Sequence, residues 1–156
     1  MIDTASVYKN EESVGRAIAR CGVPRKDLFI TSKIWNTAQR LGDVQGAFSR
    51  SLDRLKLSYV DLCLIHWPVP GCYLSTWKEL EKILESGRAL SIGVSNFDIR
   101  HLEELRKISG IIPAVNQIEC HPLCYPSELI EYCKAFGIQV QAYACLLYTS
   151  PSPRDR

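Results

Sequence analysis

The sequence predicts an α/β fold with a parallel sheet, and three observations support this prediction. Short apolar runs alternate with longer segments whose apolar residues recur at helical spacing. Each run is separated from the next by a segment long enough for a helix, which is the connection that parallel strands require. Polar side chains fall at or near the ends of successive runs, and the carboxyl ends of parallel strands share one edge of a sheet.

Composition limits the class of protein. The chain has 156 residues, 46% hydrophobic and 23% charged, which suits one globular domain. Its net charge is +2, and it has no basic run that would follow a phosphate backbone, so nucleic acid is not an expected partner. No apolar stretch approaches the ~18 residues of a membrane span, and the N-terminus does not resemble a signal peptide. We therefore expect a cytoplasmic protein.

Two helix–strand pairs are predicted after the first few residues. Residues 11–20 form an amphipathic helix that stops at Gly22, and the apolar run 28–32 follows as a strand. Residues 43–55 again carry apolar side chains at helical spacing, and the nearly continuous apolar run 60–65 is the next strand. This order is typical of right-handed crossover units.

The same alternation continues through the second half of the chain. The predicted elements are a helix at 76–85, a strand at 90–94, a helix capped by Asp98, a strand at 114–118, a helix capped by Ser127 and ended by Gly137, and a strand at 138–143. Together with the first half, this makes five full strands.

The positions of the polar residues favour a barrel over an open sheet. The residues at or near the predicted strand ends are Lys33, His66, Ser95 with Asn96, Gln117 and Tyr143. In a barrel these ends converge on one mouth, whereas an open sheet brings together only those near its switch point. The open sheet's usual GxGxxG motif is also missing. We predict a (β/α)8 TIM barrel that is incomplete, because such barrels need about 250 residues.

Four polar residues, Asp3, Tyr8, Lys33 and His66, form the candidate catalytic group. Individually, Asp3 could cap a loop, Tyr8 could pack on the surface and His66 could occupy a turn. Lys33 closes a buried strand and needs an anionic or polar partner there, for which Asp3 is the obvious candidate. An ammonium beside a phenol favours the phenolate, so Lys33 would make Tyr8 a usable general acid.

Seven cysteines are spread through predicted strands and helices. We expect them to be reduced and mostly buried. The strongest metal candidate is the group Cys120, His121 and Cys124, but no second ligand pair at a regular spacing accompanies it. No metal site is therefore expected.

Five segments, taken in order, resemble the aldo-keto reductases. They are DTASVYKNE at 3–11, TSK with Trp35 at 31–35, LIHWP at 64–68, GVSNF at 93–97 and NQIECHP at 116–122. The resemblance runs to about Ala144, and the joint order of the motifs makes it specific.

This resemblance implies NADPH-dependent reduction of aldehydes or ketones, with NADPH/NADP+ as cofactor and a small carbonyl compound as substrate. Tyr8 would protonate the carbonyl oxygen, Lys33 held by Asp3 would activate Tyr8, and His66 would orient the carbonyl. This implication agrees with the chemistry expected of the four polar residues.

The resemblance also implies the residues that surround the reactants. Ser95, Asn96 and Gln117 would bind the nicotinamide carboxamide and Tyr143 would stack on its ring. The substrate would contact His66, Trp35 and Trp67, although each of the two indoles also has an ordinary role in packing. The alternative is a non-catalytic barrel fragment or a regulatory or binding subunit.

Both ends of the chain depart from the family pattern. The strand before Asp3 has two residues, and residues 145–156 lack the family's Ser-Pro-Leu-Gly stretch, eighth strand and phosphate-binding residues. We expect residues 1–144 to form a partial barrel domain and residues 145–156 to be an unrelated or disordered tail. We expect such a fragment to bind cofactor weakly. The substrate, the preference for NADPH over NADH and the oligomeric state stay open.

Overall fold

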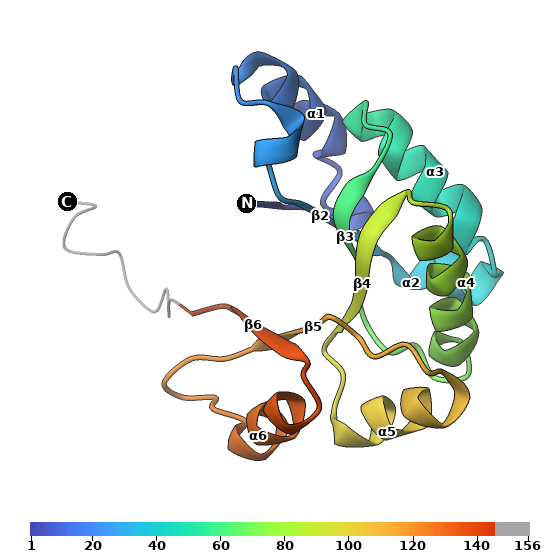
Figure 1. The fold of residues 1–156 in the computed structure, drawn as a ribbon, viewed down its shortest axis with the longest axis vertical. Helices are drawn as coiled ribbons and strands as arrows, with labels where there is room; N and C mark the ends of the chain where they lie inside the picture. The colour runs from blue at the N-terminus through green and yellow to red at the C-terminus, as the bar shows by residue number, and fades with distance from the viewer. Residues whose placement is uncertain (146–156) are drawn as a thin grey trace.

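Six parallel strands form a single curled sheet in the computed structural model, which describes residues 1–145 (Figure 1). The strands are paired in chain order, so each neighbours the next along the sequence. They are β1 (Ile2–Asp3), β2 (Ile30–Ile34), β3 (Val60–Ile65), β4 (Ala89–Ser95), β5 (Val115–Glu119) and β6 (Gln139–Tyr143). The prediction of an incomplete α/β barrel with five full strands and a short first one is confirmed.

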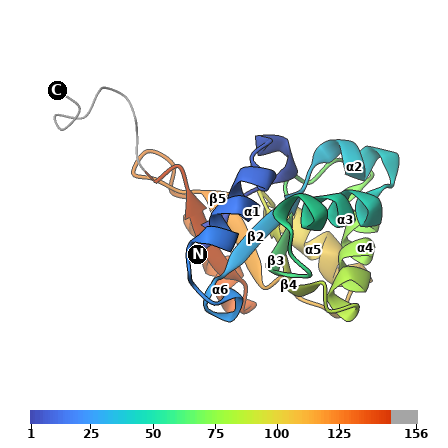
Figure 2. The same ribbon diagram turned by 90° about the horizontal axis from the view of Figure 1, so that it is seen from above.

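Helices connect the strands and cover the convex side of the sheet (Figure 1). They are α1 (Glu11–Arg20), α2 (Asn36–Leu41), α3 (Val44–Leu55), α4 (Tyr73–Glu85), α5 (Ile99–Ile108) and α6 (Ser127–Ala135). Two 3-10 helices, at Ser6–Tyr8 and Arg25–Asp27, flank α1. Figure 2 shows α3, α4 and α5 along one side of the sheet, and α4 contacts both of its helical neighbours.

The main core lies between the sheet and these helices. Its largest fully buried apolar side chains include Trp77 from α4 and Phe48 from α3. They pack with residues of the central strands such as Ile65 and Ile92. Because the helices cover these strands, nearly all of β3 is buried, which explains its continuous apolar sequence.

One glycine is required where β4 approaches β5. A Cβ atom at Gly93 would lie 2.6 Å from the backbone oxygen of Val115. Real Cβ atoms do not approach an oxygen this closely, so only glycine allows the two strands to pair at this spacing. This pairing brings Ser95 of β4 beside Gln117 of β5.

The predicted element bounds agree with the structure at α1 and β3, and three differences have physical reasons. Lys33 lies inside β2 rather than after it, because its pairing with Leu64 continues the ladder to Ile34. Helix α2 was not predicted, since its six residues are too few for a clear helical periodicity. Ser127 is the first residue of α6 and not its cap.

The cysteine prediction was partly wrong. All seven cysteines are free, as expected, but only Cys63 and Cys133 are buried, and Cys21, Cys124 and Cys145 are exposed. The three exposed residues lie outside the helices and strands: Cys21 directly follows α1, Cys124 is in the loop between β5 and α6, and Cys145 comes after β6. The predicted tail at 145–156 lies outside the described residues, except for Cys145. None of the helices within 1–145 is long and apolar enough to cross a membrane.

Replacement of Gly93 by alanine tests the close approach of β4 to β5. We expect Gly93→Ala to destabilise the protein by about 1–3 kcal/mol, because the added methyl group forces the strands apart. Gly110→Ala is the matched control, since nothing lies within 4 Å of the Cβ position there. Urea denaturation of both variants makes the comparison, and equal midpoints would show that the strands accommodate the methyl group.

Candidate active site

Nine of the ten predicted site residues line one cavity of about 380 Å³ at the carboxyl ends of the strands. They are Asp3, Tyr8, Lys33, His66, Trp67, Ser95, Asn96, Gln117 and Tyr143. The exception is Trp35. The sequence analysis missed Gln141, which also lines the cavity. Its signal was present, because Gln141 stands two residues before Tyr143 and therefore on the same face of β6.

The centre of the site is an ion pair between Lys33 and Asp3. The Lys33 side chain is 1% exposed, and its ammonium contacts the Asp3 carboxylate. The same nitrogen lies 3.3 Å from the backbone oxygen of Thr4 and 3.5 Å from the phenol oxygen of Tyr8. An ammonium this deeply buried requires such partners, because burying an unpaired charge is costly. The arrangement places a fixed positive charge beside the Tyr8 hydroxyl.

Tyr8 comes from the turn between β1 and α1, and not from a strand. It ends the 3-10 helix Ser6–Tyr8, which its own N–H closes by donating to the oxygen of Ala5 at 3.0 Å. The following residue, Lys9, has a positive φ of 55° that reverses the chain. The Thr4 hydroxyl donates to Asn10 Oδ1 at 2.7 Å and closes the loop across its base.

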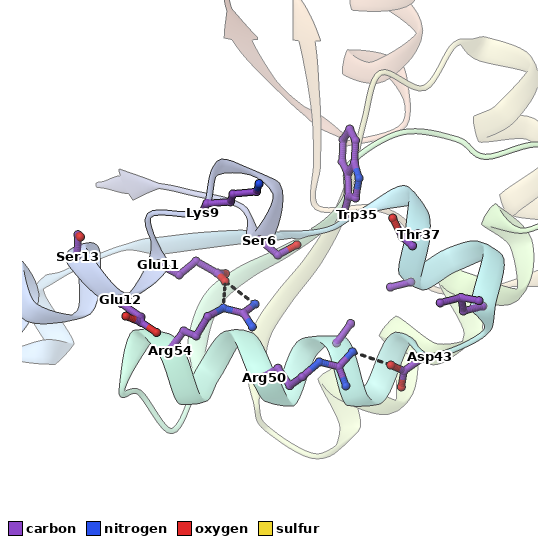
Figure 3. Close-up of a pocket in the computed structure, with 13 residues that line it drawn as sticks. Ser6, Lys9, Glu11, Glu12, Ser13, Trp35, Thr37, Asp43, Arg50 and Arg54 are labelled. Atoms are coloured by element: carbon purple, nitrogen blue, oxygen red, sulfur yellow. Dashed lines mark hydrogen bonds and ion pairs between the residues drawn. The ribbon is translucent and has the colours of Figure 1, made fainter.

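A buried carboxylate fixes this loop to the rest of the fold. Glu11, the first residue of α1, is 2% exposed. It accepts a hydrogen bond from the Ser32 hydroxyl of β2 at 3.1 Å. It accepts a second one from Arg54 Nε of α3 at 2.8 Å (Figure 3). Ser32 is the residue before Lys33. Glu11 therefore holds the loop that carries Tyr8 against the strand that carries Lys33.

His66 stands directly after β3 and its side chain is neutral at pH 7. Burial lowers the pKa of His66 from 6.5 to about 4, with a further lowering by the Lys33 ammonium and an opposing effect of Asp3. Its Nδ1 is buried and has no partner among residues 1–145. The other ring nitrogen, Nε2, makes no hydrogen bond within the same residues, and His66 lines the cavity, so Nε2 is available to a molecule there. The ring lies edge-on to Tyr8, with centroids 5.7 Å apart. His66 can thus donate a hydrogen bond but is not a protonated acid.

The opposite wall of the cavity contains the residues predicted to bind the cofactor. Asn96 has a positive φ of 62°, a conformation that asparagine tolerates, and its Nδ2 donates to the backbone oxygen of His66 at 3.0 Å. The Tyr143 hydroxyl donates to Asn96 Oδ1 at 2.7 Å. The Ser95 hydroxyl donates to the backbone oxygen of Gln117 at 2.9 Å. These bonds link β3, β4, β5 and β6 into one polar wall.

The two tryptophans occupy different places. Trp67 is 42% exposed and lines the same cavity as Tyr8. Trp35 lines a neighbouring cavity of about 580 Å³ between the Tyr8 turn and α3, where the Glu11–Arg54 and Asp43–Arg50 ion pairs also lie (Figure 3). Its indole is edge-on to His66, with centroids 4.9 Å apart. Trp35 therefore supports His66 from outside the main cavity.

The group Cys120, His121 and Cys124 lies in the loop after β5. His121 Nε2 is 3.0 Å from the Glu119 carboxylate, and its Nδ1 accepts from the N–H of Leu123 at 3.2 Å. Both ring nitrogens are thus engaged within the loop. In the described part of the chain, no three His, Cys, Asp or Glu side chains are grouped so as to hold a metal ion.

Comparison with known proteins identifies the family. The profile described as the Aldo/keto reductase family matches residues 1–152. This chain belongs to the aldo/keto reductase family. It is 52% identical over 146 residues to a glyoxal reductase of Bacillus subtilis (strain 168), a match that covers 94% of this chain and 53% of that protein. It is 41% identical over 173 residues to an aldehyde reductase of Saccharomyces cerevisiae, and this match covers 92% of this chain and 55% of that protein.

Solved structures of the same family have the same fold. An aldo/keto reductase from Brucella melitensis superposes with a TM-score of 0.90 at 45% identity, covering 96% of this chain and 59% of that one. An aldo-keto reductase from Bombyx mori, crystallised in complex with NADP, superposes with a TM-score of 0.84 at 38% identity. This match covers 97% of this chain and 56% of that one. This chain therefore spans about half the length of the relatives that it matches.

Removal of the Asp3 carboxylate tests the buried ion pair. We expect Asp3→Asn to destabilise the protein by on the order of 3 kcal/mol, because it leaves the Lys33 ammonium buried without a counter-ion. Asp43→Asn is the matched control, since the Asp43–Arg50 pair is about half exposed and such surface pairs contribute at most about 1 kcal/mol. Urea denaturation compares the two, and equal losses would contradict the importance of the buried pair.

Titration of His66 tests its neutral state. Because the pKa of His66 in the folded protein is about 4, below the ordinary 6.5, the unfolded chain takes up this proton first as the pH falls. Stability is therefore lost between pH 6.5 and 4, and His66→Gln should lose less over this range than the unchanged protein. NMR follows the titration, and the imidazole signal that is present in the unchanged protein and absent in His66→Gln is assigned to His66. A titration midpoint of this signal above pH 6 would contradict the prediction.

Proposed function

We propose that this protein reduces aldehydes and ketones to alcohols with NADPH, with Tyr8 as the proton donor. The observation that supports this most strongly is the contact of a buried, carboxylate-held Lys33 ammonium with the Tyr8 hydroxyl at a cavity. A scaffold that only binds a partner has no physical need for this arrangement. Family membership supports the same conclusion.

Tyr8 is the group best suited to give up a proton. His66 is neutral at pH 7 and Lys33 is held inside the protein by Asp3, whereas Tyr8 is 48% exposed and lines the cavity. The Lys33 ammonium, 3.5 Å away, can donate a hydrogen bond to the Tyr8 oxygen and stabilise the negative charge that develops there as the proton is transferred. Since Tyr8 is partly open to water, it can take a new proton from solvent. Lys33 and Asp3 therefore activate Tyr8 without leaving their places.

His66 orients the carbonyl group. With its proton on Nε2, the neutral imidazole can donate a hydrogen bond to a molecule in the cavity that it lines. Negative charge develops on the carbonyl oxygen as the carbon is reduced, and donors aimed at that charge lower the barrier. Two donors, Tyr8 and His66, are available to this oxygen. Trp67 provides apolar surface at the cavity, while Trp35 packs against His66 from outside it.

The opposite wall of the cavity fits a nicotinamide. Asn96 and Gln117 offer amide groups, Ser95 a hydroxyl and Tyr143 an aromatic ring, all at the same cavity as Tyr8. An amide-bearing aromatic ring needs this combination of hydrogen-bonding partners and a flat surface. When bound, the cofactor supplies the hydride. The Bombyx mori relative in complex with NADP supports NADPH as this cofactor.

The names of the relatives guide the choice of substrate. A glyoxal reductase and an aldehyde reductase are among them, which supports simple aldehydes as the compounds to test first. The cavity of about 380 Å³ is large enough for such small carbonyl compounds beside a nicotinamide ring.

Loss of the Tyr8 hydroxyl tests the proposed reaction. We expect Tyr8→Phe to lower the rate of NADPH oxidation with glyoxal or benzaldehyde by about 10²–10⁴-fold, the usual contribution of a general acid. Tyr125→Phe is the matched control, since Tyr125 is 68% exposed and outside the cavity. The decrease in absorbance at 340 nm follows the reaction. An equal rate for Tyr8→Phe and the unchanged protein, or no oxidation by the latter, would contradict the proposal.

A further inference from the structure

Asp3 has a second hydrogen bond that the proposed reaction does not use. Its Oδ1 contacts Lys33, while its Oδ2 accepts a hydrogen bond from Gln117 Nε2 at 2.7 Å. Gln117 lies on β5, four strands away from β1 in the sheet order. The bond therefore crosses the interior of the curled sheet and does not follow its hydrogen-bond ladder.

Asp3 needs support from this direction. Strand β1 has only two residues and pairs only with β2 among the described strands, through Ile2 with Ile30 and Asp3 with Thr31. The carboxylate is 27% exposed, so the sheet alone leaves it free to turn toward water. Lys33 fixes one oxygen and Gln117 fixes the other. Two fixed oxygens define the plane of the carboxylate, which a single bond does not.

Gln117 is itself held firmly enough to act as this support. It is 7% exposed, and its backbone pairs with Ser95 of β4 and Gln141 of β6. Its Nε2 also donates to Gln141 Oε1 at 3.0 Å, so both amide hydrogens have acceptors. The reverse orientation of the amide would point an oxygen at a carboxylate and at a second amide oxygen. The chemistry of its neighbours therefore fixes which way the Gln117 amide faces.

This orientation leaves Gln117 Oε1 as the free group of the amide. It makes no hydrogen bond within residues 1–145, and Gln117 lines the cavity. A carboxamide N–H bound to this oxygen would hold the Gln117 amide in the same orientation that serves Asp3. The nicotinamide side of the cavity and the proton-donor side would then share one residue.

We infer that Gln117 is a positioning residue that holds Asp3, and through Asp3 the Lys33 ammonium, in line with Tyr8. Gln117 thereby couples the binding of the cofactor to the alignment of the proton donor. The catalytic part of this inference rests on the proposed function, whereas the contact between Gln117 and Asp3 can be tested without cofactor.

A double-mutant cycle in the cofactor-free protein tests the contact. We expect the urea midpoint of the protein carrying both Asp3→Asn and Gln117→Met to shift by clearly less than the two single shifts added together. The matched control combines Asp3→Asn with Gln45→Met, which removes a glutamine that bonds the Glu79 carboxylate at 3.0 Å elsewhere. Those two shifts should add. Gln117→Asn, which keeps the amide but withdraws it from Asp3, replaces Gln117→Met if the latter does not fold.

Steady-state kinetics test the consequence for catalysis. If Gln117 positions the proton donor, Gln117→Met lowers kcat at saturating NADPH by roughly tenfold or more, because small displacements of a catalytic group are costly. If Gln117 only binds the nicotinamide, KM for NADPH rises and kcat is unchanged, which would overturn the inference. Additive shifts in the cofactor-free cycle would overturn it as well. An unchanged rate for Tyr8→Phe would instead overturn the proposed function.

Discussion

The site depends on one buried charge, the ammonium of Lys33. A lysine whose side chain is 1% exposed destabilises a fold unless its partners are fixed. Here the partner is a carboxylate at the end of the shortest strand, and that carboxylate is in turn bonded by Gln117 from across the sheet. The neutral state of His66 follows in part from the same charge, since Lys33 lowers its pKa. The Lys33–Asp3 pair thus contributes to the electrostatics around both Tyr8 and His66, although burial is the larger cause of the low pKa of His66.

The fold positions Tyr8, the proposed proton donor, by hydrogen bonds around its turn and not by a buried ion pair. Tyr8 belongs to a short turn, which would be mobile without ties on both sides. The Thr4–Asn10 hydrogen bond closes this turn, and the buried Glu11 fixes its far end to Ser32 and Arg54. Glu11 therefore fixes the position of the loop that carries Tyr8 relative to the strand that carries Lys33. The cost of burying Glu11 is offset by its bonds to both neighbours.

Much of the site was predictable because parallel strands bring their carboxyl ends together. The polar residues near five strand ends were expected at one mouth, and the cavity contains all of them. Other features had weaker signals. Lys33 looked like a strand end because it is charged, but its pairing with Leu64 continues the strand. The contacts of Gln117 with Asp3 and of Trp35 with His66 join residues far apart in sequence, and no local pattern encodes such contacts. The roles of these residues in catalysis stay predictions.

The most direct test of the central claim is the rate of aldehyde reduction by Lys33→Met at saturating NADPH. Methionine fills most of the lysine volume, and the Asp3 carboxylate that it leaves is 27% exposed, so water can reach that group. We predict a folded protein, verified by circular dichroism, whose kcat is at least about a hundredfold lower, because the Tyr8 oxygen has lost the donor that stabilises its negative charge as the proton is transferred. A folded Lys33→Met protein with an unchanged kcat would contradict the central role of this ammonium.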